Sequence, residues 1–226
     1  LFGESHGPAL GAVVEGLPAG EELDLGEIQA FLNRRAPSNS PWSTSRREAD
    51  RFSILSGYYQ GRTTGTPLTA VIANLDADSR PYTGQLRIPR PSHADWTGLI
   101  RYQGATDPRG GGHFSGRLTA PLCFAGAVCR QILRRRGVVV GARLAQIGEV
   151  KDGDVDLTSL SQEQLEELAG KKLPVFHKEQ GDKMIALVEE VRAAQDSVGG
   201  MVQGFVLGLP AGLGNPIFSG VENRLA

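Results

Sequence analysis

Hydrophobic and polar positions along the chain follow two different periods, which predict strands and helices in turn. Short apolar runs bounded by Gly, Pro or Asn are typical of strands, and they occur at residues 9–16, 52–57, 68–74, 138–148 and 201–207. Between these runs, apolar side chains recur at spacings of three and four, the period of a helix with one buried face. That spacing predicts helices near residues 24–35, 115–136, 161–169 and 181–196.

Two of the predicted helices carry signals for their ends. Asp24 followed by Glu27 is a capping-box pattern, which favours a helix start at this point. The 115–136 pattern has three consecutive arginines in its last turn, where the helix dipole favours cations. We expect its buried face to hold Leu118, Leu122, Ala125, Val128, Cys129, Ile132 and Leu133. Since strands and helices alternate without a clear linker, the pattern predicts an α/β fold of the α+β type, in a single domain over residues 1–226.

A five-residue sequence occurs twice, each time after an apolar strand pattern. Gly-Leu-Pro-Ala-Gly stands at residues 16–20 and again at residues 208–212. We interpret this identity as a trace of gene duplication, with a first repeat at about 1–195 and a second that begins at about 200. Two independent Pro-Gly turns are the alternative. Under duplication, we expect the chain to be the first part of a protein nearly twice as long.

Composition narrows the class of protein. The chain has 226 residues, of which 40% are hydrophobic and 22% charged, the balance of a soluble globular protein with a core. No apolar run approaches the roughly 18 residues of a membrane helix. Two cysteines exclude a disulfide framework and a four-cysteine metal site, so we expect a cytoplasmic protein. The 30 Gly and 13 Pro predict many tight turns.

Charge is distributed unevenly, although the formal net charge is only −1. All lysines lie after residue 150, so the preceding part of the chain is net basic through arginine alone. Arginine suits planar, bidentate recognition of phosphate or carboxylate; a codon bias is the alternative explanation. A nucleic-acid binding module is disfavoured, because aromatic residues are only 6% of the chain and the basic part lacks a strong patch.

Three histidines lie in polar segments rich in Gly or Pro, which is typical of groups that transfer protons near neutral pH. They are His6, His93 and His113, and structural hydrogen bonding is the alternative for each. The segment His113-Phe114-Ser115 follows three glycines at the predicted helix start, with Arg109 and Arg117 on either side. Free N–H groups at a helix N-terminus favour an anion, so we expect an anion-binding site there.

Other polar residues add weaker candidates. Arg34-Arg35 and Arg46-Arg47 bracket a polar loop at 36–50, where they either clamp an oxyanion-rich ligand or are simply solvated. Ser5 beside His6 is a weak candidate nucleophile, and His93 with Asp95 is a weakly supported ligand pair, so we predict no metal site. The residues together indicate an enzyme for a small phosphorylated or carboxylated substrate, with histidine as proton donor.

Six motifs occur in order along the chain. They are Gly3-Glu4-Ser5-His6-Gly7, Ser45-Arg46-Arg47-Glu48-Ala49-Asp50, Ser56-Gly57 with Gly61-Arg62-Thr63-Thr64-Gly65-Thr66-Pro67, Arg90-Pro91-Ser92-His93-Ala94-Asp95, Arg109-Gly110-Gly111-Gly112 and Asp196-Ser197-Val198-Gly199-Gly200. In combination they resemble the chorismate synthase family, over about the first three fifths of its length. The resemblance implies a β-α-β sandwich with two related halves in each chain, assembled as a homotetramer.

The resemblance also implies a reaction and a set of site residues. The family converts 5-enolpyruvylshikimate 3-phosphate to chorismate by anti-1,4-elimination of phosphate, the last common step toward the aromatic amino acids. It needs reduced FMN although there is no net redox change, and NADPH is a candidate reductant. No nucleic acid or membrane partner is implied. The residues implied are His6 and His93 for proton handling, His113, Phe114, Ser115 and Arg35 for cofactor contact, and Ser5, Arg35, Arg47 and Arg117 for substrate binding.

Three segments depart from the family's pattern, one of them Gly116-Arg117-Leu118-Thr119, where many members have Ala-Arg-Glu-Thr. His113-Phe114-Ser115 stands where many members have Arg-Ser-Ser, and Pro41 stands where many have a second loop arginine. The role of that arginine is either lost or passed to Arg46 or Arg47. The second half of the family's chains supplies further flavin contacts, and none of those is assigned in this sequence.

Overall fold

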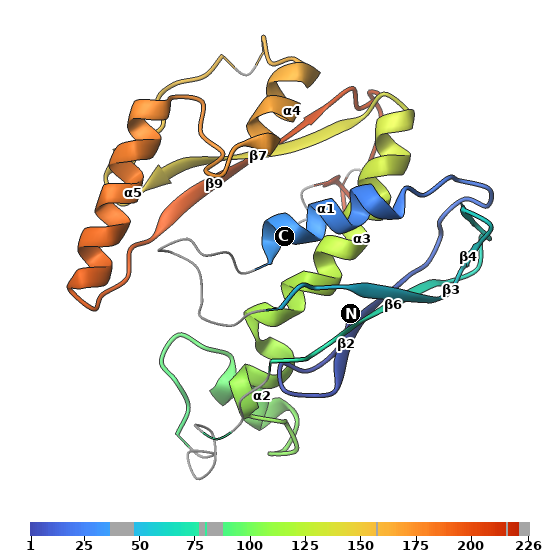
Figure 1. Ribbon diagram of the computed structural model, residues 1–226, viewed down its shortest axis with the longest axis horizontal. Coiled ribbons are helices and arrows are strands. Elements are labelled where there is room, and N and C mark those ends of the chain that lie inside the picture. The colour runs from blue at the N-terminus through green and yellow to red at the C-terminus, as the bar shows by residue number, and fades with distance from the viewer. Residues whose placement is uncertain (37–47, 77–79, 81–87, 157, 216, 222–226) are drawn as a thin grey trace. The chain divides into compact units, whose positions relative to one another are not determined.

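A computed structural model of the chain (Figure 1) describes residues 1–36, 48–76, 80, 88–156, 158–215 and 217–221. The chain divides into two compact units, Leu1–Ile132 (unit 1) and Leu133–Ala226 (unit 2). Each unit combines helices with an antiparallel sheet, which confirms the predicted α+β type. Among the residues that the structure describes, no helix is both long and apolar enough to cross a membrane.

The elements of unit 1 are mostly short. Its strands are β1 (Phe2–Gly3), β2 (Ala9–Val14), β3 (Phe52–Ser56), β4 (Tyr58–Tyr59), β5 (Arg62–Thr63) and β6 (Leu68–Ala73). Its helical segments are α1 (Leu25–Arg35), α2 (Asp95–Arg101), 3₁₀ turns at Arg109–Phe114 and Gly116–Leu118, and α3 (Thr119–Arg135), whose last residues belong to unit 2. The strands and the first helix predicted for this region are confirmed to within about two residues at their ends.

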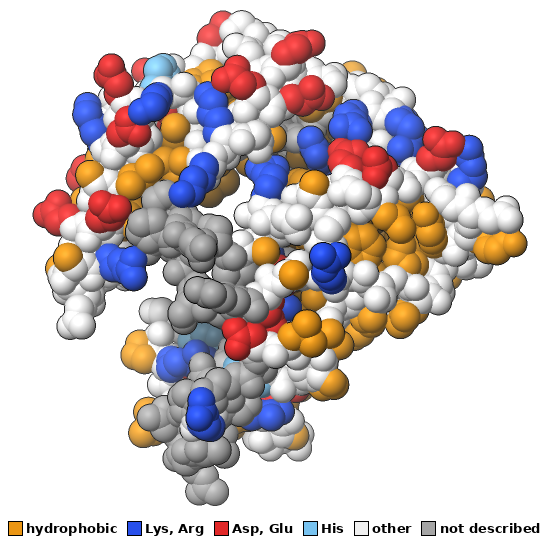
Figure 2. Space-filling model, viewed as in Figure 1, with side chains coloured by type: hydrophobic (Ala, Val, Ile, Leu, Met, Phe, Trp, Pro, Cys, Tyr) orange, Lys and Arg blue, Asp and Glu red, His pale blue; other side chains and the backbone are white. Residues whose placement is uncertain are grey.

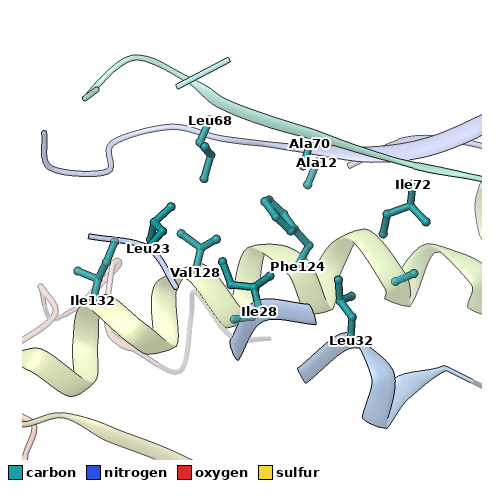
Figure 3. Close-up of a cluster of buried hydrophobic side chains, with 12 residues drawn as sticks. Ala12, Leu23, Ile28, Leu32, Leu68, Ala70, Ile72, Phe124, Val128 and Ile132 are labelled. Carbon is teal, nitrogen blue, oxygen red and sulfur yellow. The ribbon is translucent and has the colours of Figure 1, made fainter. Parts of the chain in front are cut away.

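The core of unit 1 lies between a four-stranded sheet and helices α1 and α3 (Figure 3). The strands run in the order β1-β2-β6-β3, and β2 pairs with β6 in the register Leu10↔Ile72, Ala12↔Ala70 and Val14↔Leu68. Because side chains alternate along a strand, these residues share one face. That face packs against Ile28 and Leu32 of α1 and Phe124, Val128 and Ile132 of α3. Full burial of such a side chain stabilises the fold by about 1.5–3 kcal/mol.

Polar groups also join α1 to α3. Asp24 caps α1, because its carboxylate accepts a hydrogen bond from the backbone N–H of Glu27 at 3.0 Å. The Gln131 amide of α3 pairs with the Asp24 backbone, accepting from its N–H at 3.0 Å and donating to its carbonyl at 2.9 Å. Gln131 is buried, so these two bonds fix the start of α1 against α3.

Helix α3 begins later than the sequence pattern predicts. Ser115 caps the 3₁₀ turn at Gly116–Leu118, and the α-helix starts only at Thr119. Pro121 has no N–H to donate and is tolerated only in the first turn of a helix, which sets the start close to Thr119. The predicted buried face is also wrong in part: Leu122 is 55% exposed, whereas Phe124, two residues later, is buried.

Unit 2 contains a sheet in the order β8-β7-β9 together with α4 and α5. Its elements are β7 (Val139–Ile147), β8 (Val150–Lys151), α4 (Gln162–Gly170), α5 (Lys178–Ala193) and β9 (Gly200–Leu207). The predicted strands and helices of this region are confirmed, although α5 begins and ends earlier than its pattern predicts. Leu165 and Leu168 of α4 pack on Val139 and Phe205 of the sheet. Figure 2 shows acidic and basic side chains interspersed over α4 and α5.

The repeated pentapeptide adopts the same local backbone in both units. It follows β2 in unit 1 and β9 in unit 2, and its first and last glycines have positive φ in each copy. The angles are 79° and 84° at Gly16 and Gly20, and 75° and 90° at Gly208 and Gly212. Such angles favour glycine, so both turns need this residue at the same places. The agreement supports a duplication, while the repeat bounds and the single domain stay predictions.

Candidate active site

Three consecutive glycines, 110–112, form a turn against which both predicted catalytic histidines lie. The φ angles of this triglycine turn are 60°, 87° and 53°, in the left-handed region that favours glycine. A Cβ atom on Gly110 would stand 2.5 Å from the His6 ring, and one on Gly111 would stand 3.1 Å from Nε2 of His93. The missing side chains therefore make room for both imidazoles at adjacent residues of one backbone segment.

His6 and Ser5 lie in a tight turn between β1 and β2, and Asn74 holds that turn in place. The Asn74 amide donates to the carbonyl oxygens of Glu4 at 3.0 Å and Gly7 at 2.8 Å. The Ser5 N–H donates at 3.1 Å to the carbonyl of the last glycine in the triglycine turn. Ser5 is buried, and its hydroxyl oxygen is 2.8 Å from where a Cβ of the first glycine would lie. The hydroxyl thus faces the same segment as the His6 imidazole.

His93 lies just before α2 and is paired with a carboxylate. Its Nδ1 is 2.7 Å from Oδ1 of Asp95. Arg90 donates to the same carboxylate, from Nε to Oδ2 at 2.7 Å and from Nη2 to Oδ1 at 3.0 Å. The hydrogen bond from Arg90 holds the pKa of Asp95 well below its usual range, so Asp95 is an anion near neutral pH.

His113 ends the triglycine segment and lies beside a pocket. Its Nδ1 is 3.0 Å from the Gly3 carbonyl, and because a carbonyl only accepts hydrogen bonds, Nδ1 carries a proton. The pocket has a volume of about 300 Å³, at the lower end of small-molecule sites. It is lined by Glu4, Tyr102, Ala105, Thr106, Asp107, His113 and Phe114.

Two carboxyl groups of this pocket have pKa values shifted in opposite directions. Burial and the neighbouring Asp107 carboxylate raise the pKa of Glu4. A hydrogen bond from Arg109, whose guanidinium lies 2.7 Å from the carboxylate, lowers the pKa of Asp107. Asp107 is therefore the firmer anion of the pair, and Glu4 is the carboxyl that takes up a proton first.

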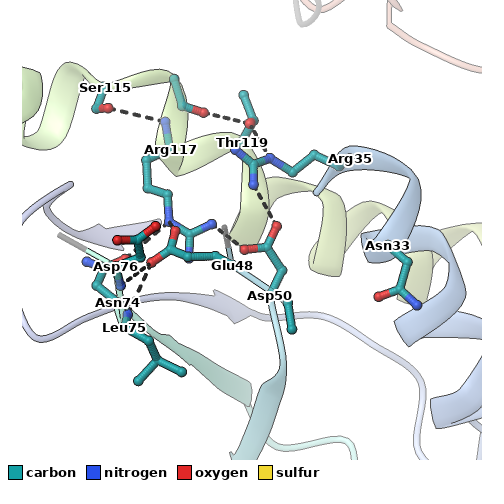
Figure 4. A network of polar contacts seen from close by, with 12 residues as sticks. Asn33, Arg35, Glu48, Asp50, Asn74, Leu75, Asp76, Ser115, Arg117 and Thr119 are labelled. Carbon is teal, nitrogen blue, oxygen red and sulfur yellow. Dashed lines mark hydrogen bonds and ion pairs between the residues drawn. The ribbon is translucent and has the colours of Figure 1, made fainter. Parts of the chain in front are cut away.

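Arg35 and Arg117, both predicted to bind substrate, converge on one carboxylate (Figure 4). Arg35 Nη1 is 2.6 Å from Oδ2 of Asp50, and Arg117 Nη1 pairs with its Oδ1. Arg117 Nε lies 2.9 Å from Glu48 Oε2 and donates to Oδ1 of Asn74 at 3.1 Å. The Asp50 side chain is fully buried, and that of Arg117 is 4% exposed. Within the described part of the chain, Nη2 of Arg117 has no hydrogen-bond acceptor.

The free donor distinguishes this arginine cluster from an ordinary buried ion pair. A buried donor without an acceptor costs about 1–3 kcal/mol, so it is rare unless something else satisfies it. An anionic ligand is one group that would do so. The sequence predicts anion binding by both arginines, but it gives no sign that they meet at Asp50.

Other site predictions fare differently. Arg47 lies outside the described residues. The anion-binding helix start predicted at His113-Phe114-Ser115 is wrong in its geometry, because a 3₁₀ turn separates these residues from α3. Instead, the Ser115 hydroxyl accepts from the backbone N–H of Arg117 at 3.2 Å. Asn74 was missed, since nothing near it in the sequence signals its contacts with the His6 turn.

Comparison with known proteins decides the family. The family model described as chorismate synthase matches residues 1–226. The chain belongs to the chorismate synthase family. This confirms the resemblance carried by the six motifs.

Named chorismate synthases from several organisms are similar over the whole chain. The proteins of Lancefieldella parvula and Methanothermobacter thermautotrophicus are 39% and 41% identical to it, over 100% of this chain and 62% and 59% of their own lengths. That of Aeropyrum pernix is 43% identical, with 59% of its length covered. A crystal structure of chorismate synthase matches 95% of this chain and 59% of its own, with a TM-score of 0.68 and 28% identity. The chain thus spans about three fifths of the length of these relatives.

Proposed function

We propose that this chain carries the histidine-bearing part of a chorismate synthase active site. The reaction is the anti-1,4-elimination of phosphate from 5-enolpyruvylshikimate 3-phosphate, which gives chorismate. The observation that carries the proposal is the placement of His6 and His93 against adjacent glycines of one turn. An imidazole titrates near neutral pH, so two of them at one place suit a reaction that must move protons.

The arginine cluster supplies the second requirement, the binding of anions. The substrate carries a phosphate and two carboxylates, and guanidinium groups bind both kinds of oxyanion through charge-assisted hydrogen bonds. Arg117 offers Nη2, and Arg35 lies beside it on the shared Asp50. Arg47 and Ser5 complete the proposed substrate contacts. Fixed positive charge at a departing phosphate lowers the barrier to its loss.

The pocket beside His113 fits the ring system of FMN in part. Tyr102 and Phe114 offer aromatic surface, with ring centroids 6.3 Å apart. Glu4 and Asp107 are acceptors suited to ring N–H groups, whereas their charge disfavours the phosphate end of the cofactor. Ser115 and Arg35 are further proposed contacts of the cofactor. Arg35 would bind a phosphate group of the cofactor or NADPH. When bound there, reduced FMN would supply the transient electron density that helps phosphate leave, and these residues would orient its ring.

Three further properties are proposed from the family alone. They are the homotetramer, the cytoplasmic location and the use of NADPH to reduce the flavin. Gel filtration with light scattering tests the first, and consumption of NADPH during turnover tests the last.

The proposed function is tested by an anaerobic assay of the protein expressed from its complete coding sequence. The assay supplies 5-enolpyruvylshikimate 3-phosphate and chemically reduced FMN, and it follows chorismate. We expect His6→Ala and His93→Ala each to lower turnover by about 100-fold or more, the usual scale for acid–base groups, with an unchanged circular dichroism spectrum. His177→Ala is the matched control: His177 stands at the N-cap position of α5 in unit 2, its side chain makes no capping hydrogen bond, and turnover is expected to be unchanged.

Two outcomes would count against the proposal. Near-normal turnover in either variant would remove that histidine from the mechanism. Absence of chorismate with the wild-type protein would instead indicate a protein that binds a phosphorylated ligand without converting it.

A further inference from the structure

The carboxylate of Asp95 is held in a fixed orientation by Arg90. It accepts from the Arg90 backbone N–H at 3.1 Å and from Nε at 2.7 Å, both to Oδ2, and from Nη2 to Oδ1 at 3.0 Å. Oδ1 makes a further short contact, since it lies 2.7 Å from Nδ1 of His93. A planar guanidinium and a carboxylate joined side by side restrain each other's rotation. Asp95 therefore presents Oδ1 to the His93 ring in one direction.

The 2.7 Å distance between Asp95 Oδ1 and Nδ1 favours a proton on Nδ1 of neutral His93. An ionised carboxylate only accepts hydrogen bonds, so a short contact to Nδ1 requires a hydrogen on Nδ1. Nε2 is then the unprotonated nitrogen. It is also the atom that lies against Gly111, on the triglycine turn where the His6 ring lies against Gly110. The carboxylate thus leaves a basic nitrogen on the side of the ring that faces the triglycine turn.

Arg90 also lies close to the imidazole but does not replace this contact. Its Nη2 is 3.3 Å from both Nδ1 and Nε2 of His93. Equal distances to the two nitrogens place this group over the ring rather than in line with either lone pair. Arg90 therefore holds Asp95 and adds positive charge near the ring, while the tautomer is set by the carboxylate.

We infer that Asp95 is a positioning residue for His93, one that fixes both the orientation and the tautomer of the catalytic imidazole. The inference rests on the proposed role of His93 in proton transfer. A carboxylate that orients a histidine in this way is known to matter for catalysis when its replacement by the amide reverses the tautomer. Asp95 itself is not proposed to touch the substrate.

Asp95→Asn in the full-length protein is the direct test. The amide can donate to Nδ1, which moves the imidazole proton to Nε2 and removes the basic nitrogen from the triglycine side. We expect kcat to fall by about 100-fold, as for loss of a general acid–base group, with KM for the substrate changed by less than about threefold. Asp95→Glu, which keeps the carboxylate, is expected to recover part of kcat. Asp182→Asn, at an exposed carboxylate paired with Lys178, is the control and should leave kcat unchanged.

A second readout does not depend on turnover. Nitrogen chemical shifts of the His93 ring, measured by NMR in the unliganded protein, should report a proton on Nδ1 in the wild type and on Nε2 in Asp95→Asn. Unchanged shifts in the variant would overturn the inference even if kcat falls. A changed tautomer with normal kcat in a protein that makes chorismate would overturn it equally. If the wild-type protein makes no chorismate but the shifts follow the expectation, the proposed function fails while the link between Asp95 and His93 stands.

Discussion

Each unit holds a buried cluster of arginine and carboxylate side chains, and the two clusters differ in whether every buried donor has an acceptor. In unit 2, Asp152 accepts from Arg143 Nη1 at 3.1 Å and from the backbone N–H groups of the two residues before α5, each at 2.9 Å. Arg143 also donates to Gln203 and to the Gly153 carbonyl, and it lies over the Phe176 ring. In unit 1, Arg117 pairs with Glu48, Asp50 and Asn74, yet its Nη2 has no acceptor among the described residues.

This difference separates two roles that a buried arginine can have. A guanidinium that leaves no buried donor without an acceptor among the described residues holds segments of backbone together, as Arg143 does for the strand β7 and the start of α5. A guanidinium left one acceptor short has a buried donor that the described residues do not satisfy and that an anion would. That is why Arg117 is interpreted as part of a site and Arg143 as part of the scaffold.

The largest effect on stability is expected from breaking the cluster of Arg143 and Asp152 in unit 2. Asp152→Ala leaves Arg143 buried without its carboxylate and removes the acceptor for two backbone N–H groups. Removal of one partner from a buried ion pair costs about 3–5 kcal/mol, so we expect a loss of that size in the free energy of unfolding. Urea denaturation of the full-length protein measures it, with the exposed Asp154→Ala as control. A loss below about 1 kcal/mol would mean that the cluster is not structural.

A smaller effect is expected from the two copies of the repeated turn. Ala at Gly208 or Gly16 must adopt a positive φ, at a cost of about 1 kcal/mol. A Cβ on Gly208 would in addition lie 2.1 Å from the Gly137 carbonyl oxygen, whereas a Cβ on Gly16 meets no described atom within 4 Å. We therefore expect Gly208→Ala to lower the free energy of unfolding by about 2 kcal/mol or more and Gly16→Ala by about half as much. Equal losses in denaturant titrations would contradict the difference in space.

The smallest effect is expected from replacing each buried arginine, Arg117 or Arg143, by lysine. Lysine is a compact charge on a flexible stem and lacks the planar fork through which Arg117 contacts Glu48 and Asp50 from separate nitrogens. Arg117→Lys should therefore raise KM for the substrate by about tenfold, which corresponds to about 1.4 kcal/mol. Arg143→Lys should lower stability but leave KM as in the wild type. Steady-state kinetics under anaerobic conditions distinguishes the two, and an equal KM in both variants would remove Arg117 from the site.

Local features of the fold were predictable, whereas the contacts that assemble the site were not. The Asp24 cap and the alternation in β2 depend on residues a few positions apart, so the sequence pattern contains them. Asn74 and Arg117 are separated by 43 residues, and no periodicity links them. The start of α3 was misplaced because apolar spacing ignores the missing N–H of Pro121 and the cap at Ser115. The six motifs predicted the family correctly, which apolar spacing alone does not do.

The triglycine turn has a consequence for how variation in this protein should be interpreted. His6 and His93 can each lie against this turn because Gly110 and Gly111 have only a hydrogen where other residues carry a Cβ atom. At these two positions a Cβ would stand in the space that the imidazole rings occupy. A survey of tolerated substitutions would rank these positions with the histidines, although they offer no proton, no charge and no ligand of their own.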